Sequence, residues 1–248
     1  MKLHTSLHKD FNKKKELVSK NGDVKFNNKK TNIDAKGKKK SSQKWLRRQV
    51  NDPFANAAKM EGYLARSAYK LLEINNKYDI FRDKKTIIDL GCTPGSWSQV
   101  ILTSKNLQNK QVIGVDLLPV KFEHKNLYFI QGDFEDKNVQ KEIVEKLKEI
   151  TKNEKSKKAD CIISDIALNN IGNAEIDRMR SERIIELELL FCEKYLSKNG
   201  NFVCKALKGA DNSVFFTIKN MFEKVYRFKP KSSRKDSSEI FLVALGKK

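Results

Sequence analysis

Residues 87–100 (IIDLGCTPGSWSQV) place two glycines, Gly91 and Gly95, between an apolar run that ends in Asp89 and a helical pattern. An α/β domain uses this arrangement to present backbone N–H groups and a helix N-terminus to a ligand at the carboxyl end of its first strand. The next apolar run ends in Asp116, whose carboxylate can accept both hydroxyl groups of an adenosine ribose. The pattern predicts a site for a dinucleotide or for S-adenosylmethionine.

The glycine spacing distinguishes these two ligands. A dinucleotide site requires Gly-x-Gly-x-x-Gly, because the middle glycine lets a pyrophosphate approach the backbone. Thr93 occupies that middle position and Pro94 follows it, so the loop lacks a pyrophosphate cradle. The spacing therefore favours S-adenosylmethionine. A glycine turn that binds no ligand is the alternative from this motif alone.

Four charged residues occupy positions that a parallel sheet would bring to one crevice, because the carboxyl ends of parallel strands converge. Asp165 closes the apolar run CIISD, Lys205 lies in NFVCKAL, and Glu239 opens the last apolar run. Lys70 lies on the helical segment that precedes the sheet. Charges embedded in apolar strand runs are rarely unpaired, which favours a role for Asp165 and Lys205. Lys70 and Glu239 are each also explained as surface charges.

The elements that must position these residues are apolar runs of strand length that alternate with helical patterns. The expected strands are 86–90, 112–116, 127–133, 161–167, 200–207, 224–230 and 239–246, and the expected helices between them are 96–103, 138–151, 174–196 and 213–222. Helices are also expected before the sheet, with a break at Pro53. This alternation predicts an α/β fold with a mainly parallel sheet covered on both faces.

The end of the chain narrows the fold class further. Only KSSRKDSS separates the last two runs, which predicts an antiparallel C-terminal hairpin. A mainly parallel seven-stranded sheet with such a hairpin strand is typical of the Rossmann-like class I S-adenosylmethionine-dependent methyltransferase fold. In dinucleotide-binding domains, all strands of the sheet are usually parallel, including the last one.

The net charge of the chain is +20, from 51 Lys and Arg against 31 Asp and Glu. Residues 1–50 alone carry +12 and few apolar residues. We therefore expect residues 1–40 to form a basic, disordered arm and residues 41–248 to form one domain. Such an excess of cations favours nucleic acid as a partner. Solvated lysines of a basic proteome are the alternative.

The sequence gives no indication of a membrane segment or a metal site. No apolar run reaches membrane-spanning length, and the N-terminus has no apolar signal core. The cysteines lack Cys-x-x-Cys spacing and the three histidines form no metal constellation. We expect a cytoplasmic monomer without a metal, whose four cysteines are buried as small apolar residues.

Seven sequence blocks follow one another in order between about Lys44 and Lys248: GYLARSAYKLLEI, DLGCTPGSWSQV, GVDLLPV, QGDFED, SDIALNNIGN, FVCKALKG and SSRKDSSEIFLVALG. Together they resemble the FtsJ/RrmJ-type RNA 2′-O-ribose methyltransferases. The resemblance implies a methyltransferase domain over residues 41–248 and S-adenosylmethionine as cofactor. It also implies methylation of a uridine 2′-hydroxyl in 23S ribosomal RNA, at the stage of the assembled 50S subunit. Transfer RNA or a messenger cap as substrate, and a non-catalytic RNA-binding assembly factor, are the alternatives.

The resemblance also implies roles for individual residues. It places a catalytic tetrad on Lys70, Asp165, Lys205 and Glu239, in which Lys205 takes up or stabilises the proton of the 2′-hydroxyl and Glu239 orients Lys205 or the ribose. It assigns cofactor contacts to Gly95, Trp97, Asp116, Asp133 and Asp165. Core packing is the alternative for Trp97, and a helix cap is the alternative for Asp133.

The loop after Asp165 departs from the family pattern, which has Asp-x-Ala-Pro followed by Ser-Gly. Leu168 stands in place of the proline and Ile171 in place of the serine, so the details of the substrate loop are open. We expect RNA phosphates to be held near the crevice by basic residues. These are Arg66, Lys70, Lys208, Arg234 and Lys235, with the segment around Trp45, Arg47 and Arg48.

Overall fold

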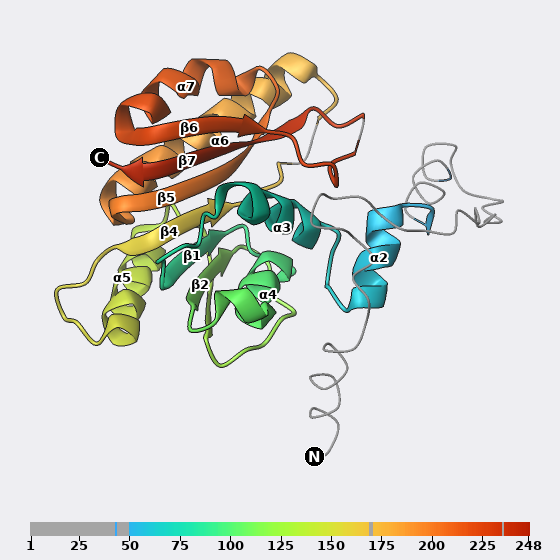
Figure 1. Ribbon diagram of the computed structural model, residues 1–248. Coiled ribbons are helices and arrows are strands. Elements are labelled where there is room, and N and C mark those ends of the chain that lie inside the picture. The colour runs from blue at the N-terminus through green and yellow to red at the C-terminus, as the bar shows by residue number, and fades with distance from the viewer. Residues whose placement is uncertain (1–42, 44–49, 169–170, 235) are drawn as a thin grey trace.

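A seven-stranded sheet forms the centre of the computed structural model, with the strand order β3-β2-β1-β4-β5-β7-β6 (Figure 1). The structure describes residues 43, 50–168, 171–234 and 236–248. The expected arm, 1–40, lies outside the described residues. The same holds for four of the expected RNA-binding residues, Trp45, Arg47, Arg48 and Lys235.

Six strands of this sheet run in one direction, and one strand, β7, runs in the opposite direction. The strands are β1 (Thr86–Leu90), β2 (Gln111–Asp116), β3 (Leu127–Gln131), β4 (Ala159–Ser164), β5 (Leu196–Leu207), β6 (Phe222–Phe228) and β7 (Glu239–Lys247). The pairs formed among β1 to β5 are parallel, whereas β7 lies antiparallel between β5 and β6. The predicted fold class and its antiparallel C-terminal hairpin are confirmed.

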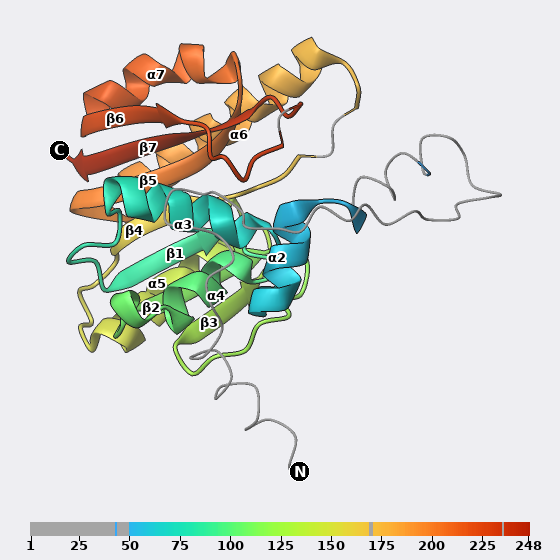
Figure 2. The same cartoon turned by 45° about the vertical axis from the view of Figure 1, so that its right-hand side comes forward.

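Helices cover both faces of the sheet (Figures 1 and 2). One face carries α3 (Ser67–Tyr78) and α4 (Ser96–Thr103), followed by the short 3₁₀ helix η2 (Lys105–Leu107), and the other carries α5 (Lys137–Thr151), α6 (Ala174–Tyr195) and α7 (Ala210–Met221). Successive side chains of a strand point to opposite faces. In β4, Ile163 therefore packs in the core beneath α3 and α4, whereas its neighbour Ile162 packs in the core beneath α5, α6 and α7.

Helix α2 (Pro53–Glu61) precedes α3, and its first residue is the proline that was expected to mark a break. Proline suits the first position of a helix because its φ is already helical and its missing N–H is not needed there. The Asp52 side chain caps this helix by accepting hydrogen bonds from the backbone N–H groups of Phe54 and Ala55, each at 3.1 Å. The helix is therefore begun by Asp52 and Pro53 together.

Strand β4 is shorter at its carboxyl end than the apolar pattern predicts. The expected strand covers 161–167, but β4 ends at Ser164. The backbone N–H of Ile166 donates to the Ser164 hydroxyl at 3.3 Å instead of to a neighbouring strand. The chain turns at this point, so Asp165 is the first residue beyond the strand.

The findings on cysteines, membrane segments and metal sites concern the described residues only. All four cysteines are buried and none is in a disulfide, as predicted. No helix among the described residues is both long and apolar enough to cross a membrane. In the same part of the chain, no three His, Cys, Asp or Glu side chains are grouped as metal ligands would be.

Candidate active site

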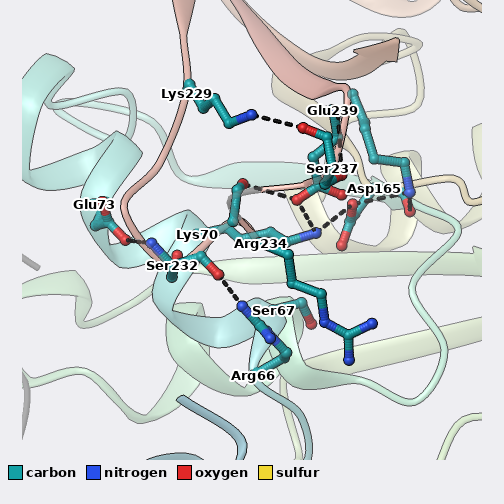
Figure 3. Close-up of polar contacts among 12 residues, drawn as sticks. Arg66, Ser67, Lys70, Glu73, Asp165, Lys229, Ser232, Arg234, Ser237 and Glu239 are labelled. Carbon is teal, nitrogen blue, oxygen red and sulfur yellow. Dashed lines mark hydrogen bonds and ion pairs between the residues drawn. The ribbon is translucent and has the colours of Figure 1, made fainter. Parts of the chain in front are cut away.

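The four charged residues singled out from the sequence meet at the carboxyl end of the sheet. Figure 3 labels three of them, Lys70, Asp165 and Glu239. Lys70 Nζ lies 2.9 Å from Glu239 Oε1 and 3.6 Å from Asp165 Oδ1. Lys205 Nζ lies 3.1 Å from the same Asp165 oxygen and donates a hydrogen bond to the Asp165 carbonyl oxygen at 2.8 Å. The four side chains are 11 to 17% exposed. The arrangement is a chain of alternating charges, Glu239–Lys70–Asp165–Lys205, with no net charge.

Glu239 pairs directly with Lys70 and not with Lys205. Its Oε1 also accepts a hydrogen bond from the Ser233 hydroxyl at 2.8 Å. Burial acts to raise the pKa of Glu239, but the charge and hydrogen bond of Lys70, with the Ser233 bond, outweigh it, so the pKa lies below its usual value. Glu239 is therefore ionised at neutral pH and fixes the ammonium group of Lys70.

The loop between β6 and β7 brings Glu239 to this position and is anchored by Glu73 of α3. The Glu73 carboxylate is buried and accepts backbone hydrogen bonds from Lys231 at 2.6 Å and from Ser232 at 2.8 Å. The Lys229 ammonium group donates to the Ser237 carbonyl at 2.6 Å. The Glu73 bonds hold the first part of the loop against the helix that carries Lys70, and the Lys229 bond joins the two ends of the loop (Figure 3).

Two arginines lie beside the tetrad and are fixed by a buried aspartate. Asp52, the cap of α2, forms an ion pair with Arg66 and lies 3.5 Å from the Nε of Arg234. Arg66 also donates to the carbonyl of Ser232. Burial and the charge of Arg234 lower the pKa of Arg66, but from a starting value so high that the group stays charged. Both guanidinium groups are thus held beside Lys70 and Glu239.

Two hollows flank the tetrad. One, with a volume of about 310 Å³, is lined by Lys205 and Glu239 together with apolar side chains of α6 and of the loop after β4, among them Ile184 and Leu168. The other, of about 380 Å³, is lined by Arg66, Lys70, Arg234 and Glu239. Glu239 borders both, so the tetrad separates a partly apolar hollow from a basic one.

The residues expected to hold a cofactor lie at the ends of β1, β2 and β3. The backbone N–H of Gly91 donates to the Val115 carbonyl at 2.9 Å, and that of Gly132 donates to the Asp116 carbonyl at 2.9 Å. These bonds bring the three loops to one edge of the sheet. At this edge α4 begins after Gly95, whose φ is +103°. The first N–H groups of a helix have no partner within the helix, so they remain available to a ligand.

The two acidic residues expected at this edge, Asp116 and Asp133, accept hydrogen bonds from backbone N–H groups. Asp116 accepts hydrogen bonds from the backbone of Thr93 at 2.8 Å and of Leu118 at 2.9 Å, so it ties the glycine loop to the end of β2. Asp133 is exposed and accepts from the backbone of Glu135 at 2.9 Å. The cap of α5 is Asp136, not Asp133, so the alternative of a helix cap for Asp133 is wrong.

Residues 63–247 match the family model of the FtsJ-like methyltransferases. The chain belongs to this family. A protein of Rickettsia felis named ribosomal RNA large subunit methyltransferase E is 41% identical over 213 residues, which cover 84% of this chain and 90% of that protein. A protein of the same name from Rickettsia bellii is 42% identical over 214 residues, with the same coverage.

A crystal structure of a Plasmodium falciparum chain, named as a ribosomal RNA methyltransferase, is similar to this FtsJ-like methyltransferase. It is 36% identical, aligns with a TM-score of 0.63, and covers 75% of this chain and 98% of the other. The expected family, the fold and the assignment as a methyltransferase are therefore confirmed. The roles of the individual site residues stay predictions.

The indole of Trp97 lies in the core of this FtsJ-like methyltransferase. It is 3% exposed, donates a hydrogen bond to the Ser67 carbonyl at 2.8 Å and packs against Phe241 with the ring centroids 5.8 Å apart. Core packing, the alternative interpretation of Trp97, explains the burial and the contacts of its side chain. A contact of Trp97 with a cofactor would therefore involve its backbone at the start of α4.

Sequence reasoning assigned no role to five residues that support the tetrad. These are Asp52, Glu73, Ser164, Glu188 and Ser233. In the sequence they look like a turn residue, two helical acids and two serines, so no local signal sets them apart. Two of them, Glu73 and Glu188, are acids at buried positions of helices. A comparison of helical apolar periodicity with the placement of acids could have found these two.

Gly91→Ala should destabilise the protein, because the new Cβ would lie 2.7 Å from Ile166 Cγ1 and 3.0 Å from Ile166 Cα, at a φ of +68°. Gly172→Ala is the matched control, since its φ is +86° but nothing lies within 4 Å of the new Cβ. We expect Gly91→Ala to lower the free energy of unfolding by about 1–3 kcal/mol more than the control does. Chemical denaturation measures this difference, and equal effects of the two variants would contradict it.

Proposed function

We propose that this protein uses S-adenosylmethionine to methylate the ribose 2′-hydroxyl of a uridine in large-subunit (23S) ribosomal RNA, after assembly into the 50S subunit. The observation that carries the proposal is the ion-paired chain of Lys205, Asp165, Lys70 and Glu239 at the carboxyl end of the sheet. The names of the relatives support ribosomal RNA as the substrate.

The edge formed by the β1, β2 and β3 loops fits S-adenosylmethionine. The positive φ values of Gly91 and Gly95 shape the loop at this edge, where a Cβ would meet Ile166 at the first glycine and Phe122 at the second. The carboxylates of Asp116 and Asp133 can accept hydrogen bonds from the ribose and from the adenine. The bound cofactor supplies a methyl group already activated on a sulfonium. No covalent help from the protein is then needed, and the site has to align the acceptor oxygen.

Lys205 is the group that accepts the proton of the ribose 2′-hydroxyl. Of the three positions around its Nζ, Asp165 holds two, through its carboxylate and its backbone carbonyl, which leaves the third for the substrate oxygen. Lys205 takes up the 2′-hydroxyl proton in its neutral form, after it has given up one proton. Its two N–H groups then donate to Asp165 and its lone pair faces the acceptor oxygen. The ammonium group of Lys70 stabilises negative charge that develops on the oxygen.

The hollow beside Lys205 accepts the target nucleoside in this proposal. Its volume of about 310 Å³ and its apolar wall of Ile166, Leu168 and Ile184 suit a base and a ribose turned out of an RNA helix. Arg66 and Arg234 on the other side of the tetrad hold neighbouring phosphates. Lys208, exposed just beyond the end of β5, adds to this basic surface.

Transfer of labelled methyl groups to purified 50S subunits, free ribosomal RNA and transfer RNA tests the proposal. The subunits come from a strain that lacks the enzyme, and digestion to nucleosides identifies the product. We expect 2′-O-methyluridine in 50S subunits. Label in transfer RNA alone would overturn the substrate, and label absent from every RNA while the cofactor still binds would favour a non-catalytic assembly factor.

Asp116→Ala should weaken the binding of S-adenosylmethionine by about 10- to 100-fold, the loss expected for hydrogen bonds to an ionised acceptor. The variant also frees the backbone of Thr93 and so loosens the glycine loop. Isothermal calorimetry measures the dissociation constant, with Glu142→Ala on the exposed side of α5 as the control. Unchanged binding in Asp116→Ala would contradict the assignment.

A further inference from the structure

Glu188 is a buried acid that the proposed reaction does not use. It lies on α6 and is 1% exposed, in the core between this helix and the sheet. Its Oε1 is hydrogen-bonded to the hydroxyl of Ser164, whereas its Oε2 accepts no hydrogen bond from any described residue. A buried carboxyl with one oxygen unsatisfied costs free energy of folding, so its presence needs an explanation.

Glu188 contacts the residues that immediately precede two members of the tetrad, Asp165 and Lys205. Its hydrogen-bond partner Ser164 immediately precedes Asp165, and Cys204, whose thiol also interacts with the carboxyl, immediately precedes Lys205. Ser164 is the last residue of β4, and its register partner in β5 is Cys204. Glu188 thus contacts both strands at the last positions before the two catalytic candidates.

The Ser164 hydroxyl connects Glu188 to the turn that carries Asp165. This hydroxyl accepts a hydrogen bond from the backbone N–H of Ile166 at 3.3 Å. Ile166 in turn packs against Gly91 so closely that a Cβ there would lie 2.7 Å from its side chain. A hydrogen-bonded chain therefore runs from Glu188 through Ser164 to the backbone on the far side of Asp165, next to the proposed cofactor loop.

The surroundings of Glu188 favour its uncharged form. Burial raises the pKa of Glu188 to about 8, although the bond to Ser164, the charge of Lys205 and the Cys204 thiol act to lower it. The titratable groups that face the carboxyl are Cys204 and Lys205 from β5 and Cys192 from α6 itself, and β4 contributes the neutral Ser164. At neutral pH the residue is a carboxylic acid.

We propose that Glu188, through its hydrogen bond to Ser164, is a positioning residue that holds Asp165 and Lys205 in the geometry required for methyl transfer. It contacts neither substrate nor cofactor and acts through Ser164 of β4 and Cys204 of β5. The inference rests on the proposed function, because alignment of Lys205 matters only if Lys205 handles the proton of the acceptor hydroxyl.

Glu188→Leu separates positioning from stability. Leucine fills a similar volume and removes the unsatisfied oxygen, so we expect an unchanged or raised thermal midpoint at pH 7. The loss of the bond to Ser164 should lower kcat about tenfold or more, while the dissociation constant for S-adenosylmethionine changes less than threefold. Glu186→Leu, an exposed position half a turn away, is the control and should keep full kcat. Wild-type kcat in Glu188→Leu would overturn the proposal.

Ser164→Ala tests the route of the coupling. It should lower kcat, and the double variant Glu188→Leu/Ser164→Ala should be no slower than the slower single variant, since both changes break one chain. Multiplicative losses would overturn the proposal. Amide hydrogen exchange of the peptide over Asp165 and Ile166 gives a readout without activity. It should accelerate in both single variants, and unchanged exchange would also overturn the proposal.

Glu188→Gln tests the charge state through the pH dependence of stability. In the unfolded chain a glutamic acid ionises near pH 4.5, whereas Glu188 in the folded protein ionises only near 8. Between these values the folded state holds a proton that the unfolded state has lost, so the free energy of unfolding falls as pH rises. Glutamine removes this penalty and keeps an acceptor for Ser164. The thermal midpoint of the variant relative to wild type should therefore rise from pH 5 to pH 8, and a constant difference would overturn the uncharged state.

Failure of this inference is distinguishable from failure of the proposed function. If wild-type protein transfers no methyl group to any RNA, the proposed function fails, and the hydrogen exchange and pH measurements still test the Glu188–Ser164 chain. If wild-type protein is active and Glu188→Leu is equally active, the inference alone fails.

Discussion

Lys205→Ala should reduce kcat for methyl transfer by about 10²- to 10⁴-fold, the range expected when a general base is removed. The side chain provides the only amine in the described structure that Asp165 holds by both its carboxylate and its carbonyl, at 3.1 and 2.8 Å. Alanine leaves the acceptor oxygen without a group to take its proton. Single-turnover transfer from labelled S-adenosylmethionine measures the effect.

The control for this prediction is Lys198→Ala. Lys198 lies exposed on the same strand, β5, but toward its amino end, so it shares the residue type and the element without the site. Cofactor binding should be nearly unchanged in both variants, because Lys205 is assigned to the acceptor side. An active Lys205→Ala enzyme would refute the role of Lys205 whatever the substrate proves to be.

Asp165→Asn should reduce kcat by about 10²- to 10³-fold, a loss typical of removing one preorganised electrostatic group. Asp165 Oδ1 is the oxygen that both Lys70 and Lys205 face, at 3.6 and 3.1 Å. An asparagine keeps the size of the side chain but leaves two ammonium groups without the anion between them. Their repulsion should displace Lys205 from the acceptor oxygen and weaken the alignment of the site.

Asp160→Asn provides the control for Asp165→Asn. Asp160 lies on the same strand, β4, near its amino end, and accepts backbone hydrogen bonds from Lys85 at 2.9 Å and Thr86 at 3.0 Å, which the amide oxygen of asparagine can retain in part. Full activity is expected there. If Asp165→Asn keeps kcat within threefold of wild type, the tetrad does not depend on its central anion and the mechanism must be revised.

The two predictions also separate the members of the tetrad. Loss of Lys205 removes the group that meets the substrate, whereas loss of Asp165 removes the group that holds it. The effects should not multiply in the double variant, because the two residues act as one unit.

The fold and the place of the site were predictable because they depend on local patterns. Short continuous apolar runs and period-3.6 helical patterns define the strands and helices, and the short connection before Glu239 defines the antiparallel hairpin. A strand end followed by Gly91 and Gly95 marks the cofactor edge for the same reason. Asp165 and Lys205 were found because charges in apolar strand runs require partners.

Only the tertiary structure decided which side chains meet. Glu239 pairs with Lys70 rather than with Lys205, and the strand before Asp165 ends early because Ser164 binds the backbone of Ile166. These contacts join segments far apart in the sequence and depend on side-chain directions that no local period specifies.

The sequence by itself thus determined the class of fold, the family and the residues that form the tetrad. The packing of α3 and α6 on the sheet determined how that tetrad is held, through Glu73 on one face and Glu188 on the other. Helical apolar periodicity can indicate that both acids lie on buried helix faces. Only the assembled layers establish what each acid contacts, Ser232 for Glu73 and Ser164 for Glu188.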